Sequence, residues 1–128
     1  MVGILILSHS KLIAEGLAEV CKQMAKGVDI IGVGGTDDGR LGVDAEKALS
    51  VLESLLQKNT DVIIYADIGS TIMAAKNIVE LSSKPANVHI ADAPLVEGSI
   101  VGSVEAMLRS DVNKILQESK NSCSLSKV

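Results

Sequence analysis

Four short apolar runs, each followed by a segment with helical periodicity, constrain the fold of this chain most strongly. The runs cover Val2–Leu7, Val28–Val33, Asp61–Ala66 and Val88–Ala91. Continuous apolar runs of this length are typical of strands buried on both faces, as in a parallel sheet. We therefore expect an α/β fold, with an open, doubly wound, mainly parallel sheet that carries helices on both faces.

The segments between the runs carry apolar residues every three or four positions, which is the spacing of an amphipathic helix. Ser10 can cap the first helix, and Asp44 and Asp111 are placed to cap two others. The last ten residues are rich in Ser, Lys and Asn and lack this periodicity. We expect one domain over residues 1–118 and a polar tail, 119–128, that frays.

The strand order decides which loops meet. A four-strand sheet of this kind commonly runs 2-1-3-4, so the chain reverses direction between strands 1 and 3, and ligands bind outside the carboxyl ends of the strands at that point. Those two ends are Ser8-His9-Ser10 and Asp67-Ile68-Gly69-Ser70. We therefore expect His9 and Asp67 to share one crevice, with Gly34–Gly39 as its third wall.

A histidine at the tip of a buried strand predicts a nucleophile. A carboxylate that accepts a hydrogen bond from one ring N–H fixes the tautomer and leaves the other nitrogen free. Asp67 is placed to do this for His9. We expect Asp67 to engage Nδ1, so that Nε2 carries a phosphoryl group.

Donors for the phosphoryl oxygens are predicted beside this histidine. A helix begins near Gly69, and its first N–H groups can bind an anion together with the Ser70 and Thr71 hydroxyls. Gly35 and Thr36 would add donors from the other side of the crevice. The expected site thus combines a nucleophile, an orienting carboxylate and an anion cradle.

Each of these residues also has a structural explanation. A lone histidine at a strand end is more often structural than catalytic. Asp67 fits the role of a helix cap, and Gly34–Gly39 has the composition of an ordinary turn. His89 lies inside a strand run and is interpreted as structural. The catalytic interpretation gains weight because His9 and Asp67 fall at the two ends where the sheet reverses direction.

Composition excludes several functions. Aromatic residues make up 1% of the chain and the net charge is −4 with no basic cluster, which argues against nucleic-acid binding. No apolar run approaches the ~20 residues of a membrane span. The two cysteines, Cys21 and Cys123, have no metal-binding spacing, and Asp37 and Asp38 lack partner ligands, so we expect no metal and no cofactor. A reducing cytoplasm fits this cysteine usage.

Other catalytic chemistries have little support. The chain contains no Gly-x-x-x-x-Gly-Lys-Ser/Thr and no Gly-x-Ser-x-Gly, the motifs of a nucleotide-binding loop and a hydrolase elbow. A hydrolase built from Ser70, His9 and Asp67 is conceivable. However, Asp67 and Ser70 lie three residues apart on one turn, and no separate oxyanion loop is evident.

Four loop motifs, in order, carry a family resemblance. They are Ser8-His9-Ser10, Gly34-Gly35-Thr36-Asp37-Asp38-Gly39, Asp67-x-Gly69-Ser70 and Asp92-Ala93-Pro94-Leu95-Val96-Glu97-Gly98. From Val2 to Leu116 the chain resembles the phosphoryl-donor subunits of phosphotransferase-system (PTS)-dependent dihydroxyacetone kinases. More distantly, it is similar to mannose-type enzyme IIA domains.

The resemblance implies a phosphotransferase component. His9 would be phosphorylated by the phosphocarrier HPr, which is charged from phosphoenolpyruvate through enzyme I. His9 would then pass the phosphoryl group to ADP on the nucleotide-binding kinase subunit. The resemblance also implies a homodimer, gives Asp67 as the residue orienting His9, and places Ser70, Gly35 and Thr36 along the site.

Two alternatives remain open at this point. The chain could be an enzyme IIA that feeds the IIB domain of a mannose-type sugar permease. It could also be a regulatory module whose binding changes when His9 is phosphorylated. Some members of the family carry fused HPr-like and enzyme I-like segments. This chain stops at Val128, so we expect it to take its phosphoryl group from a separate carrier.

Overall fold

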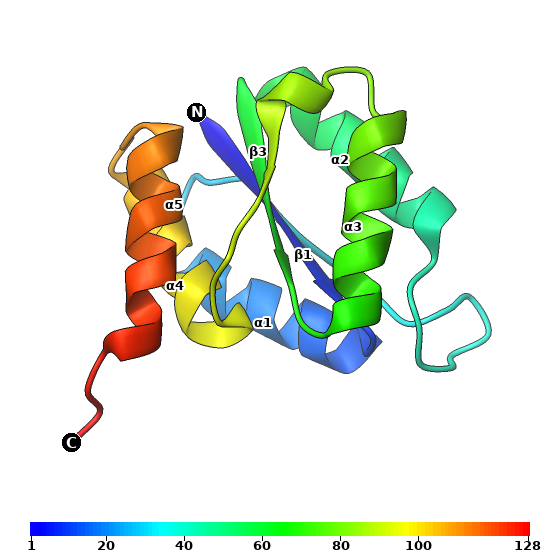
Figure 1. The fold of residues 1–128 in the computed structure, drawn as a ribbon, viewed down its shortest axis with the longest axis horizontal. Helices are drawn as coiled ribbons and strands as arrows, with labels where there is room; N and C mark the ends of the chain where they lie inside the picture. The colour runs from blue at the N-terminus through cyan, green and yellow to red at the C-terminus, as the bar shows by residue number, and fades with distance from the viewer.

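The structure, a computed structural model, describes all 128 residues (Figure 1). Strands and helices alternate along most of the chain. They are β1 (Val2–Ser8), α1 (Lys11–Met24), β2 (Ile30–Gly34), α2 (Ala45–Lys58), β3 (Asp61–Ala66), α3 (Gly69–Leu81), η1 (Pro85–Asn87), β4 (Val88–Ile90), α4 (Leu95–Met107), α5 (Val112–Asn121) and η2 (Ser122–Ser124). The α/β class expected from the sequence is confirmed.

The four strands form one sheet in the order β2-β1-β3-β4, and every neighbouring pair is parallel. This is the predicted order 2-1-3-4. Ile4 of β1 lies opposite Ile30 of β2 on one side and Ile63 of β3 on the other. The chain therefore reverses direction between β1 and β3, and the segments that follow these two strands emerge side by side.

The two faces of the sheet are covered by different helices, as expected for a doubly wound fold. Successive side chains of a strand point to opposite faces. Ile4 and Ile6 of β1 pack in one core with residues of α1, α4 and α5. Leu5 and Leu7 pack in a second core with residues of α2 and α3. Figure 1 shows α2 and α3 on one side of the strands and α4 and α5 on the other.

Two glycines of β2 allow α1 to lie close against the sheet. A Cβ atom at Gly32 would lie 2.2 Å from the carbonyl oxygen of Ala14, and one at Gly34 would lie 2.4 Å from the carbonyl oxygen of Ser10. Both neighbours are backbone atoms that cannot rotate away. The absence of side chains at these two positions therefore allows the short distance between α1 and β2. The close approach begins at the N-terminus of α1, beside His9.

The predicted start of the frayed tail is wrong. Helix α5 continues to Asn121, and Ser119 is fully buried. The Ser119 hydroxyl donates to the Ile115 carbonyl at 2.7 Å and accepts from the Tyr65 hydroxyl at 2.7 Å. A Cβ atom at Gly102 would lie 1.8 Å from that tyrosine oxygen, so α4 makes room for the contact. The polar composition at this point reflects a buried hydrogen bond.

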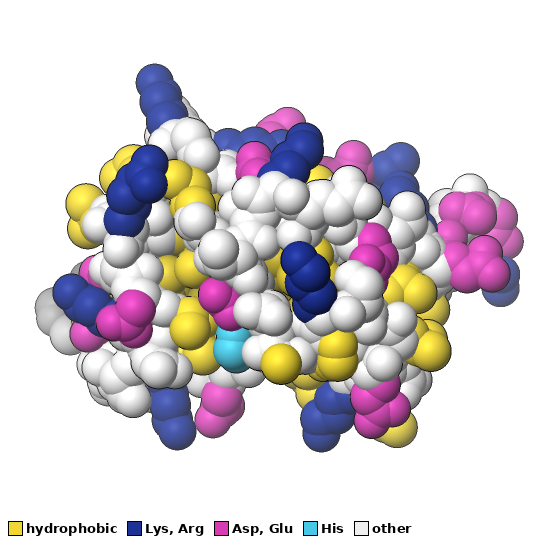
Figure 2. Space-filling view, turned by 90° about the horizontal axis from the view of Figure 1, so that it is seen from above, with side chains coloured by type: hydrophobic (Ala, Val, Ile, Leu, Met, Phe, Trp, Pro, Cys, Tyr) yellow, Lys and Arg dark blue, Asp and Glu magenta, His cyan; other side chains and the backbone are white.

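The helices are short, and the charges on the face shown in Figure 2 are mixed. No helix combines the length and the apolar character needed to cross a membrane. On the face that Figure 2 shows, acidic, basic and hydrophobic side chains are interspersed, with no large patch of one charge.

Candidate functional site

The site lies at the carboxyl ends of β1 and β3, where His9 and Asp67 meet. His9 follows the last residue of β1 and is half-buried. Ser10 then caps α1 by accepting from the amide of Ile13 at 3.4 Å. His9 therefore lies between a buried strand and a capped helix, two elements that restrict its backbone.

Asp67 joins the two strand ends through its carboxylate. Its Oδ2 accepts from the Ser8 hydroxyl at 2.7 Å and from the backbone amide of His9 at 3.1 Å, and its Oδ1 accepts from the Ile68 amide at 2.7 Å. The structure brings His9 and Asp67 together, as the strand order predicts. The contact goes to the backbone of His9, however, and the expected contact between Asp67 and the imidazole is not made.

The imidazole is held by two hydroxyls of the first turn of α3. Nδ1 lies 2.9 Å from Thr71 Oγ1, and Nε2 lies 3.2 Å from Ser70 Oγ. Thr71 is fully buried and Ser70 is exposed, so Nδ1 faces the protein and Nε2 faces the open side of the site. Thr71 thus occupies the position beside Nδ1 that was expected for Asp67. Its hydroxyl was expected at the phosphoryl oxygens instead.

The charge of Asp67 is stabilised by its surroundings. Burial raises the pKa of Asp67, but hydrogen bonds from the hydroxyls of Ser8 and Thr71 and from the amides of Ile68 and His9 outweigh it. The net effect lowers the pKa of Asp67 below its ordinary value. Asp67 is therefore an ionised carboxylate at neutral pH, one hydroxyl away from the ring of His9.

The start of α3 presents unpaired donors at the same place. The amides of Gly69 and Ser70 make no hydrogen bond with the rest of the chain, and no side chain caps the helix. The positive end of a helix dipole and its free N–H groups favour a negatively charged group. An anion attached to Nε2 of His9 would lie beside the Ser70 hydroxyl, with these amides next to it.

The loop after β2 is joined to His9 by one backbone hydrogen bond. The amide of Gly42 donates to the carbonyl oxygen of His9 at 2.8 Å, which fastens the loop to the histidine. Gly35 has a positive φ of 74°, and a Cβ atom there would lie 3.3 Å from the Cβ of Lys11. Gly35 therefore serves the turn of the loop over the start of α1.

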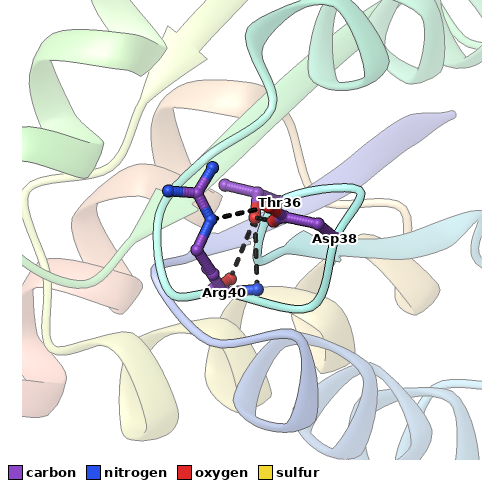
Figure 3. A network of polar contacts seen from close by, with 3 residues as sticks. All are labelled: Thr36, Asp38 and Arg40. Carbon is purple, nitrogen blue, oxygen red and sulfur yellow. Dashed lines mark hydrogen bonds and ion pairs between the residues drawn. The ribbon is translucent and has the colours of Figure 1, made fainter.

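The polar groups of Thr36 are engaged inside this loop (Figure 3). Its hydroxyl donates to Asp38 Oδ1 at 2.5 Å and accepts from the Arg40 amide at 3.2 Å. Its amide donates to the Arg40 carbonyl at 2.9 Å. The hydrogen bond from Thr36, with that from Arg40, lowers the pKa of Asp38. The nearby carboxylate thus captures the hydroxyl that was expected to bind phosphate.

The remaining polar candidates lie elsewhere. Nε2 of His89 pairs with Asp61 Oδ1 at 3.0 Å, and Asp61 begins β3, at the opposite end of the strand from Asp67. No group of three or more His, Cys, Asp or Glu side chains is arranged to hold a metal ion. Asp37 shares a hydrogen bond with Asp44, which raises the pKa of Asp37.

Known proteins are similar to this chain in sequence and in fold. The family model of the PTS system fructose IIA component matches residues 3–116. The phosphoryl donor subunit DhaM of PEP-dependent dihydroxyacetone kinase 2 from Listeria innocua is 37% identical, covering 94% of this chain and 98% of its own length. The corresponding subunit from Escherichia coli is 33% identical over 91% of this chain, which corresponds to 26% of that longer protein.

Solved structures support the same relationship. The crystal structure of a protein of unknown function, 32% identical, superposes with a TM-score of 0.82 and covers 94% of this chain and 93% of its own. A phosphotransferase system component EIIA from Streptococcus agalactiae has a TM-score of 0.67 at 11% identity, which shows a common fold. With the family model matched from residue 3 to residue 116, the chain belongs to the family of the PTS system fructose IIA component.

Proposed function

We propose that this protein is the phosphohistidine relay subunit of a phosphoenolpyruvate-dependent dihydroxyacetone kinase. His9 accepts a phosphoryl group from HPr and passes it to ADP held on the nucleotide-binding kinase subunit. The observation that carries this proposal is the position of His9 Nε2, which faces the open side of the site 3.2 Å from Ser70 at the start of α3. The identity of the substrate, dihydroxyacetone, is inferred from relatives that are named as phosphoryl donor subunits of this kinase.

The first transfer forms one P–N bond and breaks another. The lone pair of His9 Nε2 attacks the phosphorus of the charged carrier, and the carrier's nitrogen takes back the electron pair of the broken bond. The phosphoryl oxygens then meet the Ser70 hydroxyl and the free amides of Gly69 and Ser70. Phosphoryl transfer gains most of its rate from positioning and charge stabilisation, which is what this arrangement provides.

The second transfer reverses these roles. A terminal phosphate oxygen of ADP attacks the phosphorus, the bond to Nε2 breaks, and the imidazole recovers its lone pair. The chain itself contains no nucleotide-binding loop motif, which agrees with an ADP site on another subunit. Asp67 contributes by holding the backbone of His9 in place and by keeping a negative charge near the ring.

The direct test is phosphoryl transfer from phosphoenolpyruvate. The protein is mixed with enzyme I and HPr, and acid-labile, base-stable phosphate is mapped by mass spectrometry. We expect label on His9, loss of label in His9→Ala, and full labelling in His89→Gln, which alters the only other histidine. An unlabelled His9 in the presence of charged HPr would overturn the proposal.

A second acceptor is favoured by the matched family, whose description is a fructose IIA component of the PTS. An enzyme IIA of this kind would discharge to a IIB domain of a sugar permease. The phosphorylated protein is therefore offered the kinase subunit with ADP, or a IIB domain, in parallel reactions. Discharge only with ADP and the kinase subunit supports the dihydroxyacetone pathway, and discharge only to IIB replaces it with the sugar pathway.

The proposal extends to the assembly and its location. A relay that depends on phosphoenolpyruvate and HPr works in the cytoplasm, and the family resemblance implies a homodimer. Light scattering after size-exclusion chromatography tests the dimer, since a single species at the 13.3 kDa of one chain would exclude it. We also propose that residues 1–118 belong to one relay domain. The last helix of this domain, α5, continues to Asn121.

A further inference from the structure

The contact between Thr71 and His9 has two possible directions, and they have opposite chemical consequences. Thr71 Oγ1 lies 2.9 Å from Nδ1. A hydroxyl has one proton to donate and lone pairs with which to accept. If Thr71 donates to Nδ1, a neutral ring carries its proton on Nε2, and that nitrogen is no nucleophile. If Thr71 accepts from Nδ1–H, Nε2 keeps its lone pair.

The carboxylate of Asp67 decides between these directions. Asp67 lies four residues before Thr71, and its Oδ2 accepts from the amide of the same histidine, His9, at 3.1 Å. The Thr71 hydroxyl is close enough to this carboxylate to lower its pKa, and Asp67 is ionised at neutral pH. A hydrogen bond to a charged acceptor is about twice as strong as one between neutral groups. The single proton of Thr71 is therefore directed to Asp67, and the oxygen of Thr71 is left to accept from the ring.

Burial makes this arrangement durable. Thr71 is fully buried, so water does not compete for its hydroxyl, and a lost hydrogen bond there would leave an unsatisfied polar group. Ser70 differs in being exposed, and its hydroxyl can donate to Nε2 in the free protein and turn to a phosphoryl oxygen afterwards. The two neighbouring hydroxyls thus have separate tasks, one for each ring nitrogen.

We infer that Thr71 is a positioning residue that makes Nε2 the nucleophile by linking Nδ1–H of His9 to the Asp67 carboxylate. This inference rests on the proposed relay function for its kinetic consequence. The imidazole gains positive charge when Nε2 binds phosphorus, and the chain of hydrogen bonds through Thr71 transmits the charge of Asp67 to it. The protein thereby obtains the tautomer control of a histidine–carboxylate pair with a hydroxyl between the two groups.

The test compares Thr71→Val with Thr71→Ser. Valine has nearly the shape of threonine but no hydroxyl, whereas serine keeps the hydroxyl. Nitrogen NMR of histidine-labelled, unphosphorylated protein at about pH 9, where a free imidazole is neutral, reports which ring nitrogen carries the proton. We expect Nδ1–H in the wild type and in Thr71→Ser, and a larger share of Nε2–H in Thr71→Val.

Phosphorylation by charged HPr supplies the second readout. We expect Thr71→Val to accept the phosphoryl group on the order of 10- to 100-fold more slowly than the wild type, by analogy with the loss caused by removing the hydrogen-bond partner of a metal-bound histidine. Thr71→Ser should recover most of the rate. Circular dichroism of both variants verifies that the helix content of the protein is unchanged.

The outcomes separate this inference from the proposed function. An Nε2–H tautomer in the wild type overturns the role of Thr71, whatever the variants do. An unchanged tautomer and rate in a folded Thr71→Val also overturn it and leave the relay standing. A wild type that shows the Nδ1–H tautomer but is never phosphorylated on His9 keeps the hydrogen-bonding role and overturns the relay.

Discussion

The Asp67 carboxylate accepts a hydrogen bond from the backbone amide of His9 at 3.1 Å and leaves the imidazole to two hydroxyls. The carboxylate therefore acts on the position of the nucleophile and the hydroxyls act on its ring. Because the same oxygen also accepts from Ser8, one charge holds the ends of two neighbouring strands together. The nucleophile and its orienting groups thus lie just beyond two strand ends and on the first turn of α3.

Asp67→Asn should slow phosphorylation of His9 by about 10- to 100-fold, because a neutral amide weakens the hydrogen bonds to Ser8 and His9 and removes the charge. Rates of transfer from charged HPr measure this effect. Asp61→Asn is the matched control, since it makes the same chemical change at the other end of β3, where the partner is His89. Equal slowing in both variants would contradict a specific role for Asp67.

The contribution of Asp67 to the free energy of unfolding should decrease at acidic pH. The folded protein lowers the pKa of Asp67, so this contribution is complete above the unfolded value of about 4 and is lost as pH falls through the lower folded value. We expect the difference in unfolding free energy between wild type and Asp67→Asn to stay constant from neutral pH to about pH 5. It should shrink below about pH 4. Urea denaturation at a series of pH values provides the measurement.

Ser70→Ala removes the hydroxyl beside Nε2 and keeps the free amides at the start of α3. We expect a loss of about tenfold in the rate of phosphorylation, which corresponds to one hydrogen bond of about 1.4 kcal/mol. Stability should change by less than about 0.5 kcal/mol because Ser70 is exposed. A loss as complete as that of His9→Ala would show that the amides contribute nothing alone.

Gly34→Ala should destabilise the fold by about 1–3 kcal/mol, because the added methyl group meets the carbonyl of Ser10. It should also slow phosphorylation, since α1 begins beside His9. Gly16→Ala is the control: nothing lies within 4 Å of a Cβ atom there, and Gly16 is inside α1. We expect this second variant to stabilise the protein by about 0.5–1 kcal/mol in thermal or urea unfolding.

Arg109→Gly should stabilise the protein by about 0.5–1 kcal/mol. Arg109 has a φ of 61°, a left-handed conformation that glycine adopts without strain, and it follows the end of α4. Arg109→Ala serves as the control, because it removes the same long side chain but keeps the Cβ atom. A stabilisation that is equal in both variants would assign the effect to the side chain instead of the backbone.

The sequence predicted the fold because its signals are local and repeated. The continuous apolar run before His9 and the one before Asp67 each mark a buried strand, and the order of strands places their ends together. The exact ends of the strands were harder to predict. The second strand begins at Ile30, two residues after the start of its apolar run at Val28. Apolar character marks burial, whereas the hydrogen-bonded register sets where a strand starts.

The arrangement of individual polar atoms could not be read from the chain. The Asp67 carboxylate contacts the backbone amide of His9, whereas the Thr71 hydroxyl contacts Nδ1 of the ring. Side-chain rotamers decide which of the two reaches the imidazole. The Thr36 hydroxyl is taken by Asp38, two residues away. Ser119 looks like part of a polar tail until the hydroxyl of Tyr65 is found beside it.

The self-contained network of the loop after β2 has an evolutionary consequence. Thr36, Asp38 and Arg40 satisfy one another, and the loop touches the nucleophile through the Gly42 amide and the main-chain oxygen of His9. Substitutions on the outer side of this loop can therefore accumulate without disturbing the reacting ring. The outer loop and the phosphoryl chemistry of His9 are free to diverge at different rates.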